Sequence, residues 1–324
     1  MKVIEYNAIG NPADVLEIKD VPSVAPGEGQ VRVKVLATPI HPSNLLQISG
    51  NYGTMPTFPA HPGAEGVGQV VEVGAGVSHL QAGQHVLLSG VGGTWREEIT
   101  GPAQAFIPVP AGDIEQMSMA VINPLTAHLL LKSVQDLNEG DWIIQSAANS
   151  AVGEYLIQLA AQRGIKTINV VRRESLAPRL KSLGADVVLV DGPDLAERAK
   201  AATNGADIVY AIDAVGGDIF TRMVQSLSYG SKVSCYGVLA MQMPTLDLMA
   251  VIFNNIAVKG FWLAKWFETS SPEEKQATFG EIIPLIAGGK LSSAVDSRFT
   301  LDEIKQAVTR AGESNRDGKV LLTP

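Results

Sequence analysis

The sequence predicts an α/β protein in which a six-stranded, doubly wound parallel sheet accompanies a second, mostly β domain. From about residue 121, short apolar runs rich in β-branched residues alternate with helical stretches, a pattern typical of parallel strands joined by crossover helices. Residues 140–173 have the pattern of a strand, a turn of small residues, an amphipathic helix and a second strand. The first 120 residues instead show short strands separated by Pro and Gly.

The first part of the chain begins with a predicted strand, MKVIEY, and continues with little sustained helical periodicity. Three further strands are expected at VRVKV (31–35), GVGQVVEVG (66–74) and HVLL (85–88). Short strands of this kind with turns between them indicate a compact, partly barrel-like β domain.

The second part contains six predicted strands, and six strands complete a doubly wound sheet. Gly184 and Gly205 mark the turns before the third and fourth of them. Helices are expected at 272–288 and 301–311, and GKVLL (318–322) as a final strand that returns to the first domain. The predicted domains are therefore 1–120 with 265–324, and 121–264. The six predicted strands lie at 142–145, 167–171, 187–190, 207–212, 231–236 and 256–262.

Composition narrows the class of protein. The 324 residues exceed one ordinary domain, and 46% hydrophobic with 18% charged residues is typical of a globular α/β enzyme. A net charge of -8 without a basic patch argues against nucleic-acid binding. The single cysteine, Cys235, excludes an intramolecular disulfide and favours a reducing compartment, although it also fits a small buried strand residue. Without a targeting leader or a run of about 20 apolar residues, we expect a cytoplasmic protein.

The turn between the first two strands of the second part is typical of a dinucleotide site. Small residues there let backbone N–H groups and a helix N-terminus approach a pyrophosphate, and the turn holds Asn149, Ser150, Ala151, Val152 and Gly153. The next strand ends in paired arginines at the place where a carboxylate would bind the 2′-hydroxyl of NAD. Two arginines there favour a 2′-phosphate, so the predicted cofactor is NADPH. The alternatives are a helix that only packs on its strand and a solvated strand end.

Five strings resemble the medium-chain dehydrogenase/reductase superfamily, in which a chaperonin-10-like domain precedes a Rossmann domain. They are PSNLLQISGNYG (42–53), INPLTA (122–127), NSAVG (149–153), INVVRR (168–173) and KGFWL (259–263). The resemblance covers the whole chain and is greatest to the trans-2-enoyl thioester reductases. It implies NADPH-dependent reduction of an activated carbon-carbon double bond, with a trans-2-enoyl thioester as the favoured substrate. The alternatives are an NADPH quinone oxidoreductase and a catalytically idle NADPH-binding protein.

The resemblance also implies roles for individual residues. The tyrosine of the GNYG string is the general acid in the enoyl reductases, and Tyr52 occupies that place. Tyrosine suits the role because its ordinary pKa of about 10 keeps it protonated at neutral pH. Without the resemblance, Tyr52 is an exposed loop aromatic.

Cofactor contacts follow from the resemblance in the same way, and Lys319 is one of them, although a lone lysine otherwise indicates a solvated charge. Trp262 is expected at the cofactor more than Trp266, which suits a core position. The implied cofactor-binding residues are Asn123, Asn149, Ser150, Ala151, Val152, Arg172, Arg173, Tyr236, Gly237, Val238, Leu239, Phe261, Trp262, Leu263 and Lys319.

The zinc-dependent members of the superfamily need three protein ligands around an open position. The corresponding places here hold His41, Ala64 and Asn123, so no metal is predicted, and His41 and His61 are interpreted as local hydrogen-bonding or packing residues.

Two further departures from the enoyl reductase pattern concern the cofactor turn and the acid. Ala151 replaces a glycine near the phosphates, and Asn44 replaces a carboxylate near the proposed acid. No basic cluster suited to the phosphates of coenzyme A is visible. A homodimer is implied, with the last Rossmann strand pairing across a two-fold axis.

Overall fold

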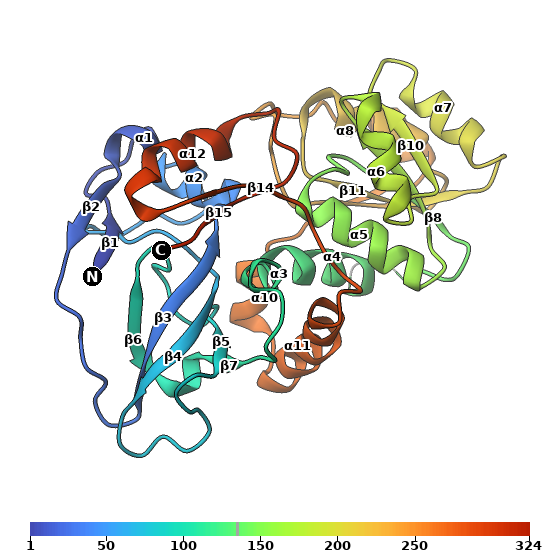
Figure 1. Cartoon of the computed structure of the whole chain (residues 1–324). Helices are drawn as coiled ribbons and strands as arrows, with labels where there is room; N and C mark the ends of the chain where they lie inside the picture. The colour runs from blue at the N-terminus through green and yellow to red at the C-terminus, as the bar shows by residue number, and fades with distance from the viewer. Residues whose placement is uncertain (134–135) are drawn as a thin grey trace. The chain divides into compact units, whose positions relative to one another are not determined.

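The structure, a computed structural model, describes residues 1–133 and 136–324 and divides into two compact units. The first unit comprises Met1–Ile122 and Phe279–Pro324, and the second comprises Asn123–Thr278 (Figure 1). The first domain was predicted to include residues from 265 onward, whereas the observed second unit continues to Thr278.

The second unit is built on a six-stranded sheet in the order β10-β9-β8-β11-β12-β13, with all neighbours parallel. The first strand in sequence lies in the middle and the chain winds outward from it in both directions. This is the doubly wound arrangement that the alternation of strands and helices predicted, and the prediction is confirmed. The strands are β8 (Trp142–Gln145), β9 (Lys166–Val171), β10 (Val187–Val190), β11 (Ile208–Asp213), β12 (Lys232–Cys235) and β13 (Ala257–Gly260).

Helices alternate with these strands, and the core forms where their apolar residues meet the sheet. Ile144, Ile168 and Val233 of the sheet pack in one buried cluster with Phe220 and Met223 of α8. This burial of strand and helix residues stabilises the sheet. The helices are α4 (Ile122–Ser133), α5 (Ala151–Gln162), α6 (Ala177–Ser182), α7 (Leu195–Ala202), α8 (Gly217–Ser226), α9 (Leu248–Phe253), α10 (Leu263–Thr269) and the first half of α11 (Pro272–Ala287).

The first unit is mostly β, as predicted. A seven-stranded sheet has the order β14-β15-β3-β4-β5-β7, with β6 also paired to β3, and β1 forms a separate antiparallel pair with β2. Because β15 pairs antiparallel with β3, the C-terminal segment returns to this unit as expected. The strands are β1 (Lys2–Glu5), β2 (Glu17–Asp20), β3 (Gln30–Pro39), β4 (Val67–Val73), β5 (His85–Leu87), β6 (Glu98–Pro102), β7 (Ile107–Pro108), β14 (Val295–Phe299) and β15 (Lys319–Leu322).

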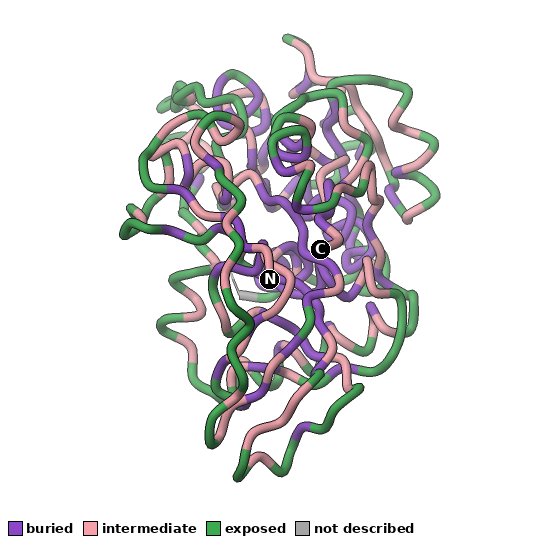
Figure 2. The backbone as a smooth tube through the Cα atoms, turned by 60° about the vertical axis from the view of Figure 1, so that its left-hand side comes forward, coloured by how far each residue is buried: buried purple, intermediate pink, exposed green. Residues whose placement is uncertain are grey.

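The long strand β3 gives the first unit its core because alternate residues point to the same face. Val31, Val33 and Val35 are fully buried and pack with Val70 and Phe106. Figure 2 shows buried residues gathered in the interior of the trace and exposed residues mainly along its outer parts. The helices of this unit are α1 (Pro12–Val15), α2 (Pro42–Ile48), α3 (Ile114–Ser118) and α12 (Ile304–Gly312), with short 3-10 turns at 103–105 and 301–303.

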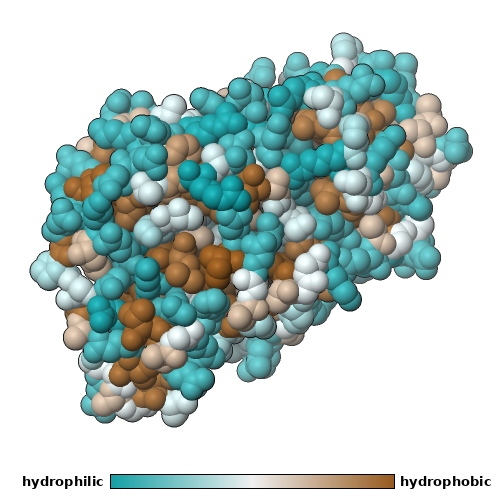
Figure 3. All heavy atoms as spheres, in the orientation of Figure 1, coloured by the Kyte–Doolittle hydropathy of each residue, from teal (hydrophilic) through white to brown (hydrophobic). Residues whose placement is uncertain are grey.

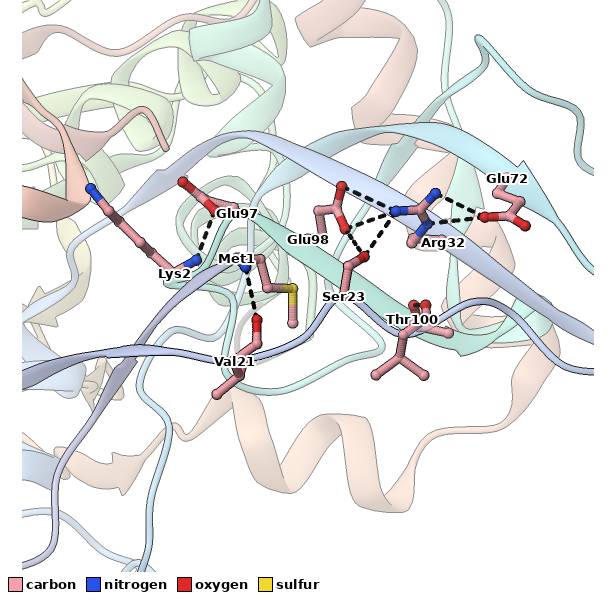
Figure 4. A network of polar contacts seen from close by, with 10 residues as sticks. Met1, Lys2, Val21, Ser23, Arg32, Glu72, Glu97, Glu98 and Thr100 are labelled. Carbon is pink, nitrogen blue, oxygen red and sulfur yellow. Dashed lines mark hydrogen bonds and ion pairs between the residues drawn. The ribbon is translucent and has the colours of Figure 1, made fainter.

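On the same unit, polar contacts join three adjacent strands (Figure 4). Arg32 of β3 donates from Nη2 to Oε2 of Glu72 on β4 at 2.8 Å and from Nη1 to Oε2 of Glu98 on β6 at 3.1 Å. These groups are partly exposed, so each pair contributes at most about 1 kcal/mol to stability. Their main effect is to satisfy the charges of cross-strand neighbours.

Hydrophobic and hydrophilic side chains are interspersed over both units on the face drawn in Figure 3. Within residues 1–133 and 136–324, no helix has both the length and the apolar character needed to cross a membrane.

Candidate active site

Tyr52 lies in the loop that follows α2 and is half-buried. The loop begins with a sharp turn at Gly50, whose φ of +76° favours glycine, and a Cβ there would come within 2.7 Å of the Ile9 side chain. The Asn51 amide then donates to the Leu46 carbonyl at 2.8 Å. The end of α2 therefore fixes the backbone next to Tyr52.

At the other end of α2 lies a buried cluster of three ionisable residues, His41, Glu65 and Lys319, which we name the His41 cluster. His41 precedes the helix, Glu65 precedes β4, and Lys319 begins β15. Nε2 of His41 lies 2.6 Å from Oε1 of Glu65, and Nδ1 lies 3.3 Å from Nζ of Lys319. The three side chains are nearly inaccessible to solvent, with relative exposures of 2%, 0% and 6%. A carboxylate and an ammonium are thus bridged by an imidazole in a dry environment.

The carboxyl group of Glu65 is held in place by backbone donors. Its Oε2 accepts from the amides of Val121 and Ile122, both at 2.9 Å, at the start of α4. Negative charge is favoured at that position because a helix N-terminus presents unpaired N–H groups. The backbone of Glu65 is fixed as well, since its carbonyl accepts from the hydroxyls of Thr38 at 2.7 Å and Thr94 at 2.9 Å.

His41 is neutral in this arrangement. Burial lowers the pKa of His41, and the Lys319 charge acts in the same direction, while the hydrogen bond and charge of Glu65 oppose them. A neutral imidazole has one N–H donor and one acceptor nitrogen. The carboxylate of Glu65 can only accept, so Nε2 donates to it and Nδ1 accepts from the Lys319 ammonium.

Asn44 lies beside the cluster and is also buried. Its Oδ1 accepts from the backbone N–H of His41 at 2.8 Å, which satisfies a donor at the start of α2. Compared with the enoyl reductase pattern, Asn44 was expected to remove an acceptor near the proposed acid. The structure shows that the side chain still accepts a hydrogen bond, and that the donor is the backbone of His41.

The cluster does not fit a metal. Both ring nitrogens of His41 have protein partners, one of them an ammonium, and Ala64 has no donor atom. No group of three or more His, Cys, Asp or Glu side chains suited to a metal ion occurs in the part of the chain that the structure describes. The reading of His41 and His61 as hydrogen-bonding residues is confirmed, since Nδ1 of His61 lies 3.2 Å from the Ile4 carbonyl. The alternative that Lys319 is a solvated charge is wrong.

In the second unit, the predicted phosphate turn leads from β8 into α5. Ser150 caps the helix, and its Oγ accepts from the Gly153 amide at 3.2 Å. A Cβ on Gly153 would lie 2.5 Å from the Ala148 carbonyl oxygen, so only glycine lets the helix approach the turn this closely. Beside the turn, the hydroxyl of Ser146 donates to Oδ1 of Asp213 at 2.6 Å, which ties the ends of β8 and β11 together.

The other predicted cofactor residues follow the carboxyl ends of neighbouring strands, where open α/β sheets bind ligands. Arg172 and Arg173 are exposed directly after β9. After β12, the Tyr236 amide donates to the Asp213 carbonyl at 2.9 Å. Burial raises the pKa of Tyr236, and the nearby Ser150 acts in the opposite direction, so this segment lies beside the phosphate turn. The buried Tyr236 hydroxyl has no hydrogen-bond partner among the described residues. After β13, the Phe261 amide donates to the Cys235 carbonyl at 2.8 Å.

Two of the predicted cofactor residues, Asn123 and Trp262, have features that bear on ligand contact. Asn123 is 6% exposed, and its Nδ2 has no hydrogen-bond partner within the described residues. A buried amide without an acceptor is costly, so this donor fits a ligand oxygen. Trp262 is 41% exposed, whereas the indole N–H of Trp266 donates to Oε1 of Glu274 at 3.0 Å.

Sequence reasoning missed two acidic residues, Glu65 and Asp213. Glu65 is the single carboxylate within the stretch PGAEGVGQVV, and Asp213 comes directly after the apolar residues of IVYAID. An acidic residue is almost never fully buried unless it is paired. An acid in an apolar stretch therefore indicates a buried carboxylate with a partner, and this pattern could have identified both residues.

Two family models match the chain. One, described as an alcohol dehydrogenase GroES-like domain, matches residues 27–111, and the other, described as a zinc-binding dehydrogenase, matches residues 151–285. The mitochondrial enoyl-[acyl-carrier-protein] reductase of Rattus norvegicus is 37% identical over 331 residues, covering 100% of this chain and 88% of the relative.

Solved structures of two kinds are similar over 100% of this chain. A complex of Etr1p with NADP and crotonyl-CoA has a TM-score of 0.91 and 30% identity, with 99% of that chain covered. A candidate NADPH:quinone reductase from Bacillus thuringiensis has a TM-score of 0.90 and 31% identity, with 98% of that chain covered.

Proposed function

Because this chain belongs to the medium-chain dehydrogenase/reductase superfamily, in the branch of enoyl thioester and quinone reductases, we propose that it is a zinc-independent, NADPH-dependent enoyl thioester reductase. The observation that carries the proposal is the retention of a GNYG tyrosine on the α2 loop together with a phosphate turn and paired arginines at the sheet edge. In this proposal the first unit supplies the proton donor and the substrate contacts, and the second unit holds the cofactor.

The residues at the sheet edge fit a dinucleotide. The amides of Asn149, Ala151 and Val152, which precede or begin α5, would donate to a pyrophosphate, while the Ser150 amide donates to the Ala147 carbonyl at 2.8 Å. Arg172 and Arg173 would bind the 2′-phosphate as charge-assisted donors. The unpaired Nδ2 of Asn123 would donate to an oxygen of the nicotinamide ribose region. Segments 236–239 and 261–263 would form the wall around the nicotinamide.

When bound, NADPH supplies a hydride that forms a C–H bond at the β-carbon of the enoyl thioester. Negative charge then moves to the thioester oxygen and the α-carbon, which must take a proton. Tyr52 donates that proton from its phenol and recovers one from solvent. The two new C–H bonds would replace the double bond, with NADP⁺ as the oxidised product.

The deciding experiment measures NADPH oxidation with a short 2-enoyl coenzyme A ester and, separately, with a benzoquinone, for the wild type and for Tyr52→Phe. We expect thioester turnover to fall by roughly 10²- to 10⁴-fold in the variant, because a positioned general acid contributes that much. The dissociation constant for NADPH should not change. Full thioester activity in Tyr52→Phe would reject the role of Tyr52.

A quinone oxidoreductase is the second candidate, supported by the similarity to the Bacillus thuringiensis structure. Hydride transfer to a quinone needs no carbon acid, so turnover of benzoquinone alone, unaffected at Tyr52, would select this candidate. NADPH binding with no oxidation of either substrate would instead indicate a binding protein without catalytic activity.

We further propose that two copies pair through the edge of the sheet in the second unit. The strand β13 is last in the sheet order and all four of its residues are exposed. The neighbouring α9 has no buried residue, and Met249, Ile252 and Phe253 are 64%, 66% and 66% exposed. Apolar side chains beside an open strand edge suit a second copy of the chain, which would extend the sheet. Light scattering should give the dimer mass, and Ile252→Asp with Phe253→Asp should give the monomer.

A cytoplasmic location stays a prediction. The relative from Rattus norvegicus is named mitochondrial, so fractionation of cells that express the protein is the appropriate test.

A further inference from the structure

We propose that His41 is a positioning residue that links the carboxylate of Glu65 to the ammonium of Lys319 through a single tautomer, and that this link orients Lys319 toward bound NADPH. The proposal rests on the proposed function to the extent that it takes NADPH as the ligand. Its first part, the tautomer, concerns only residues of the first unit.

The direction of the hydrogen bonds follows from the two ends of the cluster. The Glu65 carboxylate accepts two backbone N–H groups on Oε2, so its Oε1, 2.6 Å from Nε2 of His41, accepts as well. At the other end, the Lys319 ammonium can only donate, and it lies 3.3 Å from Nδ1. Only the tautomer with the proton on Nε2 satisfies both contacts. The alternative tautomer would leave Nε2 without a proton beside a carboxylate and would place an N–H group against an ammonium.

The link matters because of what it does to Lys319. Lysine has a flexible stem and a compact charge with three donors, so its direction is not set by its own geometry. The contact with Nδ1 fixes the direction of one N–H bond of Lys319 and so restricts the orientation of the whole ammonium group. Position 319 begins a strand in the interior of the sheet, between β14 and β3, so its backbone is also constrained. An oriented, desolvated ammonium binds phosphate or carboxamide oxygens more tightly than a mobile one, because less side-chain entropy is lost on binding.

A single substitution can reverse the polarity of the link without removing it. In Glu65→Gln, the amide oxygen can keep the two backbone N–H groups at the start of α4. The amide NH₂ then faces Nε2 of His41 and must donate to it. The imidazole proton moves to Nδ1, where it faces the Lys319 ammonium, so Nδ1 no longer accepts from Lys319 while the size of residue 65 and the helix capping are preserved.

The first measurement is the tautomer itself, by long-range ¹H–¹⁵N NMR of ¹⁵N-histidine-labelled full-length protein. The chain has five histidines, and His41→Asn identifies the signal of His41 by its loss. We expect a protonated Nε2 in the wild type and a protonated Nδ1 in Glu65→Gln. A wild-type Nδ1–H tautomer, or a doubly protonated ring at pH 7, would overturn the proposal whether or not the variant folds.

The second measurement is NADPH affinity in a double-mutant cycle of Glu65→Gln and Lys319→Met. We expect Glu65→Gln to weaken binding about tenfold, the typical value of a hydrogen bond to a charged group, and to have no further effect when Lys319 is methionine. Glu72→Gln, an exposed glutamate of the same unit, is the matched control and should bind like the wild type.

The outcomes separate this inference from the proposed function. A tenfold loss that persists unchanged in the Lys319→Met background would show that Glu65 acts through the fold and would overturn the role of His41. Wild-type protein that fails to bind NADPH would reject the proposed cofactor, and with it the second part of the inference, while the measured tautomer would still decide the first.

Discussion

The two units place their polar groups in opposite ways. In the second unit, the predicted cofactor residues follow the strand ends, which present backbone amides, exposed arginines and short turns. In the first unit, the polar groups of the His41 cluster are buried side chains brought together from residues 41, 65 and 319. The former arrangement follows from the course of a single strand-turn-helix segment. The latter exists only after the whole unit has formed.

This difference has an energetic side. Buried charges are stable only when every partner is present, because the loss of one leaves the other desolvated and unpaired. Exposed charges at strand ends keep their hydration and can be removed at little cost. We therefore expect substitutions in the buried cluster of the first unit to lower the free energy of unfolding. Substitutions at the sheet edge of the second unit should mainly weaken cofactor binding.

The largest effect is expected for Glu65→Leu. Two backbone amides and the His41 ring lose their acceptor at once, so the free energy of unfolding should fall by about 3 to 5 kcal/mol. Urea denaturation followed by circular dichroism measures it. Glu72→Leu, which removes an exposed partner of Arg32, should change stability by no more than about 1 kcal/mol. Equal losses in the two variants would contradict the distinction between the units.

A smaller loss is expected for Gly153→Ala, although alanine normally stabilises a helix interior by about 1 kcal/mol relative to glycine. The new methyl would meet the Ala148 carbonyl oxygen at 2.5 Å, so we expect a net destabilisation of about 1 to 3 kcal/mol together with weaker NADPH binding. Thermal unfolding and fluorescence titration test both. Gly112→Ala, where nothing lies within 4 Å, is the control and should leave both quantities unchanged.

Arg172→Ala combined with Arg173→Ala should affect binding alone. We expect the dissociation constant for NADPH to rise roughly 10- to 100-fold, because charge-assisted bonds to the 2′-phosphate are lost, while that for NADH stays the same. Both arginines are exposed, so the unfolding free energy should change by less than about 0.5 kcal/mol. An equal rise in the dissociation constants of NADPH and NADH would mean that these arginines do not bind the 2′-phosphate.

The smallest effect is a dependence of stability on pH that originates at His41. The pKa of His41 is lowered in the folded protein, so between that value and the ordinary value near 6.5 the unfolded chain binds more protons. Stability from this residue is therefore complete above pH 6.5 and falls as the pH decreases, with a slope of at most about 1.4 kcal/mol per pH unit. Denaturation at pH 5.5 and 7.5 should show a smaller difference in His41→Asn than in the wild type. An unchanged difference would mean that other groups cause the dependence.

The sequence predicted the sheet of the second unit nearly residue by residue. Its strands are short, apolar and separated by helices, and the order of the sheet follows from right-handed crossovers between successive strands. The positions of Ser150 and Arg172 at strand ends follow from the same local pattern. The role proposed for Tyr52, in contrast, is implied only by the resemblance.

The His41 cluster could not be predicted because its members are far apart in sequence. Glu65 lies 24 residues from His41, and Lys319 lies 278 residues from it. Lys319 by itself has the character of a solvated charge, and only the pairing of β15 between β14 and β3 buries it. The burial of Lys319 cannot be predicted from sequence periodicity or spacing, because it depends on the register of an interior strand.

The interior position of β15 also has a consequence for the order of events during synthesis. The ribosome makes β3 and β4 early, then the entire second unit, and only afterwards the segment that fills the sheet position beside β3. Until then the nascent first unit has an open strand edge and lacks the third member of its buried ion cluster. Because synthesis proceeds from the N-terminus, the second unit can fold before the first unit is complete. At this stage, chaperone binding would protect the exposed strand edge of the first unit.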